Sequence, residues 1–260
     1  MKLAFEKWEG LGNDFVLIDA PGLGLDLDAH AVQRLCDRRY GVGAGGVLLV
    51  VGEGSARRMI VRNADGSRPE MCGNGLRCVA AHLFTPRSLQ LIATDAGARV
   101  CEVRPLSADR FEVNVQMGTA RRGEDLVALI DGREHRFLTM DMGNPHAVTF
   151  EAYDDRAVDV LGPAVAAIPP GGTNVELCRV EGGRIAVTVW ERGVGRTLAC
   201  GTGACAVAAA ACDTGRARFG TRVRVALPGG ELEVTVDEDS RDVQMRGPAR
   251  RVFSGEVVIA

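Results

Sequence analysis

With 260 residues, of which 46% are hydrophobic and 25% charged, the chain is long enough to bury a large core in one domain or two smaller ones. A formal net charge of −3 leaves no basic surface for tracking nucleic acid, so we expect no nucleic-acid partner. Charges begin at Lys2 and no apolar run reaches about 18 residues, which argues against a signal peptide or a membrane span and predicts a cytoplasmic protein.

Short valine-rich segments separated by glycines indicate a chain dominated by strands, with few helices. In chain order, the predicted elements are a helix over 29–38 after Asp28 as N-cap, strands over 47–51 and 59–61, a helix over 76–84, strands over 111–115 and 187–190, a helix over 204–211 and a strand over 222–227. Two of the three helices begin just after a Cys-Gly-X-Gly sequence. The mixture predicts the α+β class.

An internal repeat organises the chain. Residues 72–81, CGNGLRCVAA, align with residues 200–209, CGTGACAVAA, at a separation of 128 residues. Each copy follows a short strand and a glycine-containing loop, which predicts two pseudo-symmetric halves, each a curved, mostly antiparallel sheet or barrel around a central helix. We expect an N-terminal half over 1–118 and a C-terminal half over 119–260, with the last strand free to return to the first half and the active site in the cleft between them.

The eight cysteines are expected to be thiols, because a reducing compartment disfavours disulfides. Four of them lie in mixed apolar contexts and are read as packing residues: Cys36, Cys101, Cys178 and Cys212. No Cys-X-X-Cys pair or Cys/His spacing supports a zinc site, so no metal is predicted.

The cysteines that begin the two repeats, Cys72 and Cys200, lie where acid-base groups would be expected. A helix N-terminus lowers the pKa of a cysteine there and favours the thiolate. The glycines that follow let the backbone approach a ligand, and the free N–H groups of the first turn suit a carboxylate. With one thiol on each side of an α-carbon, one removes the proton and the other returns one to the opposite face, which is two-base racemisation.

An amino-acid α-proton is weakly acidic, and pyridoxal phosphate normally stabilises the carbanion. The lysines of this chain are only Lys2 and Lys7, neither a good Schiff-base candidate, so we predict no cofactor. Stabilisation would instead come from helix dipoles and N–H donors in a closed, dry cleft.

At these residues the chain resembles the diaminopimelate epimerase family over nearly its whole length. Five ordered blocks carry the resemblance: residues 10–15 (GLGNDF), 62–67 (RNADGS) leading into 70–75 (EMCGNG), 142–146 (MGNPH), 172–176 (GTNVE), and 190–195 (WERGVG) leading into 199–203 (ACGTG). The resemblance implies a fold of two halves with barrel-like sheets around central helices, in agreement with the repeat.

The resemblance further implies interconversion of LL- and meso-2,6-diaminopimelate, a step in lysine and peptidoglycan synthesis, by the thiols of Cys72 and Cys200. It implies a homodimer and a small-molecule substrate. Four residues would hold the reacting carboxylate through their N–H groups: Gly73, Asn74, Gly201 and Thr202. Two would flank the reacting centre, orienting its amino group or tuning the thiols: Glu191 and His146. Others would bind the distal amino-acid centre: Arg192, Asn13, Asn63, Asn144 and Asn174.

The chain departs from the family pattern in two places. Many relatives carry an acidic residue followed by Gln or Gly where this chain has Gly45 and Gly46, which puts a contact of that loop in doubt. Relatives commonly have Glu where this chain has Arg196, a charge reversal near the second cysteine loop that bears on loop anchoring or substrate preference.

Three alternatives stay open. The first is a racemase of another amino acid on the same scaffold, which Arg192 and the four asparagines argue against because a single-centre substrate has no distal carboxylate. The second is a noncatalytic two-lobed binding protein, a type that lacks the paired cysteines. The third is a redox protein that forms a Cys72–Cys200 disulfide.

Overall fold

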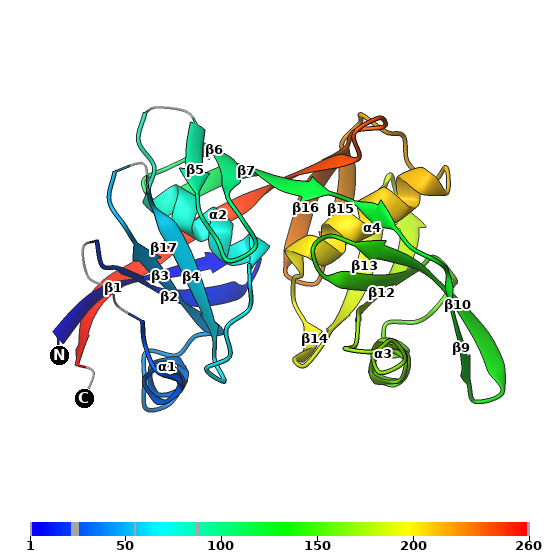
Figure 1. Ribbon diagram of the computed structural model, residues 1–260, viewed down its shortest axis with the longest axis horizontal. Helices are drawn as coiled ribbons and strands as arrows, with labels where there is room; N and C mark the ends of the chain where they lie inside the picture. Colours follow the sequence, from blue (N-terminus) through cyan, green and yellow to red (C-terminus); the bar gives the residue numbers. More distant parts are fainter. Residues whose placement is uncertain (1, 22–25, 55, 87–88, 259–260) are drawn as a thin grey trace. The chain divides into compact units, whose positions relative to one another are not determined.

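The computed structural model in Figure 1 describes residues 2–21, 26–54, 56–86 and 89–258. It divides into two compact units, Met1–Val115 with Gly247–Ala260, and Gln116–Arg246. The expected halves were 1–118 and 119–260; in the structure the second unit begins at Gln116, and the chain from Gly247 onward belongs to the first unit. Among the described helices, none is long and apolar enough to cross a membrane.

A ring of strands encloses one helix in the first unit. The strands are β1 (Lys2–Gly10), β2 (Asn13–Asp19), β3 (Gly46–Val51), β4 (Arg58–Asn63), β5 (Leu89–Ile92), β6 (Arg99–Pro105), β7 (Arg110–Thr119) and β17 (Asp242–Val258). Only β2 and β3 pair in parallel, while β17–β1, β1–β2, β3–β4, β5–β6 and β6–β7 pair antiparallel among the registers described. The pairing of β7 with β17 and a bridge from Arg58 to Ala93 complete the ring. Within it lies α2 (Gly73–His82), which is buried up to Ala81.

The second unit repeats this plan around α4 (Gly201–Asp213). Its strands are β8 (Arg121–Arg122), β9 (Leu126–Ile130), β10 (Arg133–Asp141), β11 (Pro145–Thr149), β12 (Asn174–Glu181), β13 (Arg184–Glu191), β14 (Gly195–Thr197), β15 (Val223–Leu227) and β16 (Gly230–Val236). β10 and β11 are antiparallel, β11 and β12 parallel, and β12 and β13 antiparallel. The order continues through parallel β13–β15 and antiparallel β15–β16 and β16–β17.

The two units therefore share one succession of parallel and antiparallel neighbours, in which β1–β4 correspond to β10–β13 and α2 to α4. The residue register agrees with this correspondence. Val47 pairs with Arg62 in the first unit, and Val175 pairs with Trp190 in the second, so both partners are displaced by the same 128 residues as the two cysteines. The predicted α+β class, with a curved sheet around a central helix in each half, is confirmed.

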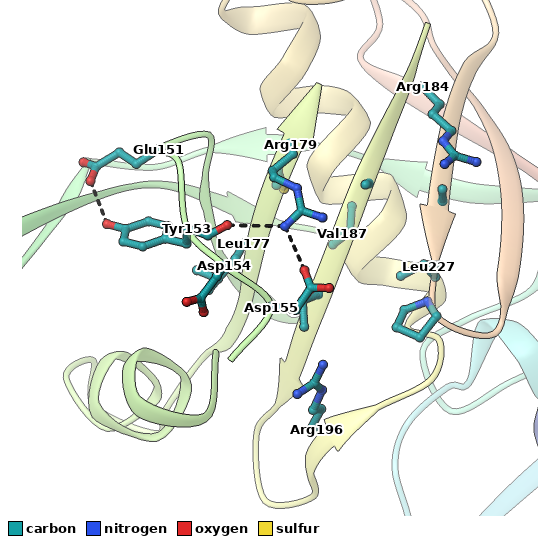
Figure 2. A pocket seen from close by; sticks show the side chains of 15 residues that line it. Glu151, Tyr153, Asp154, Asp155, Leu177, Arg179, Arg184, Val187, Arg196 and Leu227 are labelled. Atoms are coloured by element: carbon teal, nitrogen blue, oxygen red, sulfur yellow. Dashed lines mark hydrogen bonds and ion pairs between the residues drawn. The ribbon is translucent and has the colours of Figure 1, made fainter. Parts of the chain in front are cut away.

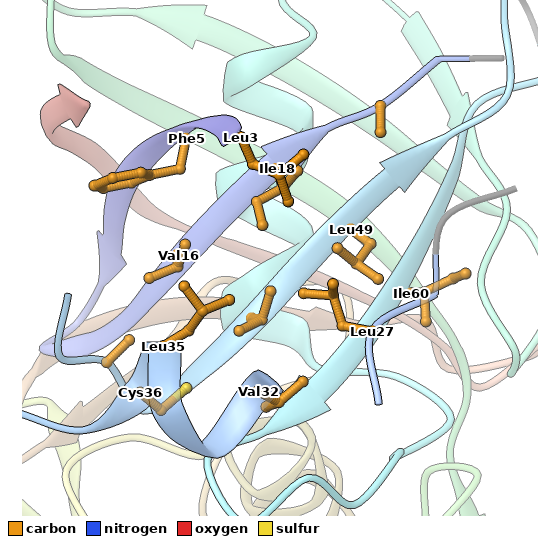
Figure 3. Packing of buried hydrophobic residues seen from close by; sticks show 13 residues of the cluster. Leu3, Phe5, Val16, Ile18, Leu27, Val32, Leu35, Cys36, Leu49 and Ile60 are labelled. Atoms are coloured by element: carbon orange, nitrogen blue, oxygen red, sulfur yellow. The ribbon is translucent and has the colours of Figure 1, made fainter. Parts of the chain in front are cut away.

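Helix α1 (Ala29–Cys36) covers the outer face of the first sheet. Its buried side chains, Val32, Leu35 and Cys36, pack against Val16, Ile18 and Leu49 of the strands (Figure 3). The predicted cap is confirmed, since the Asp28 carboxylate accepts from the N–H of Ala31 at 2.8 Å. The helix ends two residues before the predicted limit because the next residue, Asp37, turns the chain by accepting from two following N–H groups.

Helix α3 (Val158–Ala166) was not predicted, and its sequence explains why. Gly162 and Pro163 interrupt the helical pattern, and no side chain caps the N-terminus. The glycine serves packing instead, because a Cβ at that position would lie 2.6 Å from the ring of Trp190. Tertiary contact with the sheet thus overrides a poor local propensity.

Candidate active site

Cys72 and Cys200 are the N-cap residues of α2 and α4. Both have extended backbones, and their Sγ atoms accept from the N–H of Gly75 at 3.5 Å and of Gly203 at 3.3 Å. The helices therefore begin at residues 73 and 201, three residues before the predicted starts, because the thiol replaces a missing helical acceptor. Cys72 is half-buried, whereas Cys200 is buried.

The first turn of each helix carries the four N–H groups predicted to hold a carboxylate. Helix geometry leaves the N–H groups of Gly73, Asn74, Gly201 and Thr202 without a carbonyl acceptor inside the helix. Their orientation along the helix axis suits an anion. That they bind substrate remains a prediction.

The second glycine of each repeat has a packing role that the sequence interpretation did not give it. A Cβ on Gly75 would lie 2.7 Å from Cδ2 of Leu48, and a Cβ on Gly203 would lie 2.6 Å from Oε1 of Glu176. Each glycine thus admits a side chain from the adjacent strand against the helix start. The two strand residues are 128 positions apart and occupy corresponding places in the two units.

In the first unit a buried arginine supports the helix start. Arg77 is fully buried; its Nη2 donates to Oδ1 of Asn74 at 3.0 Å, and its Nε donates to the carbonyl of Pro248 at 3.0 Å. The Asn74 side chain is therefore held by the protein. A Cβ on Gly10 would lie 3.0 Å from Nη2 of this arginine, so the β1–β2 turn also leaves room for it.

The other predicted residues of the first unit, Asn13 and Asn63, lie at the ends of β2 and β4. Nδ2 of Asn63 donates to the Ser67 hydroxyl at 2.9 Å, which orders the loop leading to Cys72. At the departure from the family pattern, the Gly45 N–H donates to the Asp14 backbone carbonyl at 2.8 Å, so the glycine loop is anchored without its own acidic side chain.

In the second unit, five side chains form a hydrogen-bonded series that ends at the thiol of Cys200. Nδ1 of His146 lies 2.7 Å from Oε1 of Glu176, and both side chains are completely buried. Nε2 of His146 lies 3.1 Å from Oδ1 of Asn144, whose Nδ2 donates to Oγ1 of Thr202 at 3.3 Å. Oγ1 of Thr202 is 3.5 Å from Sγ of Cys200. The structure thus brings four predicted residues together and adds Glu176.

Glu191 is the second carboxyl group near Cys200. Burial raises the pKa of Glu191, and hydrogen bonds from Thr197 and Cys200 offset part of this effect. Burial, together with the carboxylates of Glu191 and Glu176, raises the pKa of the Cys200 thiol well above its usual value. The expected lowering by the helix dipole is therefore wrong for Cys200, because desolvation and two nearby negative charges outweigh it.

Arg192 is exposed, and backbone carbonyls hold its guanidinium. Nη1 donates to the carbonyl of Gly171 at 2.7 Å, while its backbone N–H donates to Oδ1 of Asn174 at 2.9 Å. Nδ2 of Asn174 donates to the carbonyl of Pro145 at 3.1 Å, so this amide ties β12 to β11 and to the arginine. Gly172, with φ +76°, accommodates the arginine stem, since a Cβ there would lie 2.9 Å from its Cδ.

Arg196 lies at a different feature, a cavity of about 340 Å³ on the second unit (Figure 2). It forms an ion pair with Asp159 of α3 at 3.2 Å, so the reversed charge anchors β14 to that helix. Across the cavity, Arg179 pairs with Asp155 at 2.8 Å. None of the predicted catalytic or substrate-binding residues lines this cavity.

All eight cysteines are free thiols, and the four read as packing residues are buried. Burial raises the pKa of Cys36 and of Cys212 to about 11, which suits inert thiols. Over residues 2–258, apart from the short undescribed stretches, no three His, Cys, Asp or Glu side chains cluster as metal ligands would.

Comparison with known proteins gives the family. The model of the diaminopimelate epimerase family matches residues 5–123 and 138–252. A diaminopimelate epimerase from Desulforudis audaxviator is 44% identical, covering 99% of this chain and 100% of that protein. One from Leptospira biflexa is 38% identical, with 100% of each covered. The chain belongs to the diaminopimelate epimerase family. Membership makes it an isomerase, as the sequence motifs predicted.

Solved structures of other racemases share the fold of this family member. A probable proline racemase from Agrobacterium radiobacter superposes with a TM-score of 0.74 at 15% identity, covering 99% of this chain and 93% of that one. A hydroxyproline epimerase from Agrobacterium vitis gives 0.72 at 16% identity, covering 98% and 92%. At this identity the likeness shows the fold alone.

Two buried residues beside the family's cysteine motifs were not predicted, Arg77 and Glu176. Both have a signal in the sequence. Arg77 is a charged residue between Leu76 and Cys78 in a mostly apolar helix, and Glu176 is the one charged residue in the buried part of β12, residues 174–178. Aligning the repeat over the strands as well as the helices would have placed Glu176 opposite Leu48.

Proposed function

We propose that this protein interconverts LL- and meso-2,6-diaminopimelate by two-base inversion at one α-carbon, with Cys72 and Cys200 as the acid-base pair. The observation that carries the proposal is the equivalent placement of the two thiols. Each caps the first turn of the central helix of its unit, in a chain whose relatives are named diaminopimelate epimerases.

The step balances without an external reagent. One Sγ, as thiolate, takes the α-proton as the C–H bond breaks, and the electron pair is delocalised into the α-carboxylate. The opposite S–H gives its proton to the other face of the carbon, and the returning pair forms the new C–H bond. The chemistry requires the thiols to face one α-carbon from both sides, while first-turn N–H groups stabilise the charge on the carboxylate.

The raised pKa of Cys200 keeps its proton on sulfur in the substrate-free protein. This state suits it to act first as the acid, which leaves the half-buried Cys72 as the first base. The reverse direction exchanges the two roles once a proton has been transferred.

Arg192 and the four asparagines would bind the distal amino-acid centre of the substrate. Nη1 of the Arg192 guanidinium donates to the carbonyls of Gly171 and Gly172, and the residue is exposed, which fits a partner for the distal carboxylate. Asn13 and Asn63 would add polar contacts from the first unit, and Asn144 and Asn174 would fix the residues beside them. The substrate is a small molecule.

The proposal includes no cofactor. Lys7, the more buried of the two lysines, lies 2.6 Å from a carboxylate oxygen of Asp14 and also donates to the Gly43 carbonyl, so its amine is occupied. We also propose a cytoplasmic homodimer, on the resemblance to the family. Sedimentation of the purified protein measures the dimer.

The test is solvent-deuterium incorporation at the α-carbon of LL-diaminopimelate, without added cofactor. Wild type should exchange with inversion, and Cys72→Ala and Cys200→Ala should each lose epimerisation by about 10²- to 10⁴-fold. Cys212→Ala is the matched control, since this buried thiol lies at the other end of α4 and should leave the rate unchanged.

Exchange with another amino acid but not with diaminopimelate would keep the chemistry and discard the substrate. No exchange with any amino acid tried would contradict the proposal as a whole and favour a binding protein.

A further inference from the structure

The buried pair of His146 and Glu176 occupies a place where the fold needs no charge. In the first unit, Phe15 and Leu48 stand on the equivalent parallel strands, with the same register: Phe15 pairs with residue 46, and His146 pairs with residue 174. All four side chains are at most 3% exposed. An apolar pair therefore fills the same position beneath an otherwise similar cysteine-capped helix.

Stability does not explain the acid. Withdrawing a carboxylate from water carries a large penalty that one partner repays only in part, and apolar replacement of buried ion pairs is often neutral or stabilising. Among the described residues, Oε2 of Glu176 has no hydrogen-bond partner, so the carboxylate directs its bonding at His146 through Oε1 alone. Its position against Gly203 shows that the first turn of α4 is built around it.

The contacts decide which ring nitrogens carry a proton. A carboxylate only accepts, so Nδ1 of His146 must donate. Oδ1 of Asn144, 3.1 Å from Nε2, also only accepts, so Nε2 donates too and both ring nitrogens carry a proton. The Asn144 amide in turn donates to Thr202 at the start of α4. Without the carboxylate, the ring would lose the partner that fixes both its orientation and its second proton.

We propose that Glu176 is a positioning residue, whose buried carboxylate holds His146 with both ring nitrogens protonated and Nε2 directed to the Asn144–Thr202 contact beside Cys200. Its catalytic consequence rests on the proposed function, whereas the state of the ring is a property of the protein alone. Glu176 itself touches no reacting atom.

The test uses Glu176→Gln, which keeps the side-chain shape but offers an amide that both donates and accepts. Proteins labelled with ¹⁵N-histidine are compared by NMR; wild type should show His146 with both ring nitrogens protonated, and the variant a neutral ring with a proton on one nitrogen only. The kcat for diaminopimelate should fall about 10- to 100-fold, the range for losing a carboxylate that orients a functional histidine, with KM within about two-fold.

A second variant, His146→Phe with Glu176→Leu, copies the apolar pair of the first unit. It identifies the His146 signal by its loss, and it should fold at least as stably as wild type while losing the kcat. Identical ring-nitrogen signals in wild type and Glu176→Gln would overturn the inference, as would a changed protonation of the ring with unchanged kcat. A changed protonation of the ring in a protein inactive on diaminopimelate would instead contradict the proposed substrate and leave the assignment of the ring intact.

Discussion

The starts of α2 and α4 share a backbone plan and differ in what lies beneath it. Both have a thiol cap and a glycine at the third helical position. Under the first lies Leu48 beside an apolar ring, and under the second lies Glu176 paired with His146. A duplicated scaffold thus presents two thiols in unlike electrostatic surroundings. The difference shows that the repeat determines where a thiol sits, while its neighbours determine when it holds a proton.

Placing the acid of the second unit at the equivalent position of the first unit should have the largest effect on stability. Leu48→Glu buries a carboxylate where Phe15 stands in place of an imidazole, so we expect a loss of about 3–5 kcal/mol in the free energy of unfolding, the range for an uncompensated buried charge. Urea unfolding at neutral pH measures it. Leu48→Met is the control, because a similar apolar volume should cost less than about 1.5 kcal/mol. Equal midpoints for the two variants would show that the first unit tolerates the acid.

Alanine substitutions at Gly75 and Gly203 test the same difference between the two helix starts, with a smaller expected effect on stability. In Gly203→Ala the new Cβ meets a carboxylate held by His146, so we expect a loss of about 1–3 kcal/mol. In Gly75→Ala it meets the end of Leu48, which can rotate, and the better helix propensity of alanine offsets about 1 kcal/mol. Thermal unfolding of both variants compares them. A larger loss in Gly75→Ala would refute the idea that the hydrogen bond makes the second site rigid.

The pH dependence of stability should show the smallest difference. Burial raises the pKa of Glu191 in the folded protein, so that state binds the proton more tightly than the unfolded chain does. Its contribution is therefore most favourable below the ordinary value of 4.5 and declines as pH rises through the folded pKa. Glu191→Gln places an uncharged amide where the first unit has Asn63 and should flatten this decline. Urea midpoints between pH 4 and 8 measure it; parallel curves for wild type and variant would remove Glu191 as the source.

Local patterns predicted much of the architecture. The predicted strand segments became β3, β4, β7, β13 and β15, and the Asp28 cap formed as expected. These features depend on residues within a few positions of one another, where alternation and capping act directly. The repeat needed no structure either, because two copies of one motif at a fixed spacing are visible in the chain itself.

Other features exist only through contacts between distant segments. Helix α3 has a poor helical sequence and forms because Gly162 fits against Trp190. The buried Arg77 side chain donates to the carbonyl of Pro248, which is 171 residues away in the chain.

By itself, the sequence determined the two thiol positions, the helices they cap and the family, since these rest on short-range patterns. Tertiary structure alone decided that Glu176 faces His146, and that the surroundings of Cys200 raise the pKa of its thiol. Burial and the distance between charges set those energies, and both depend on strands that the chain brings together from 30 residues apart.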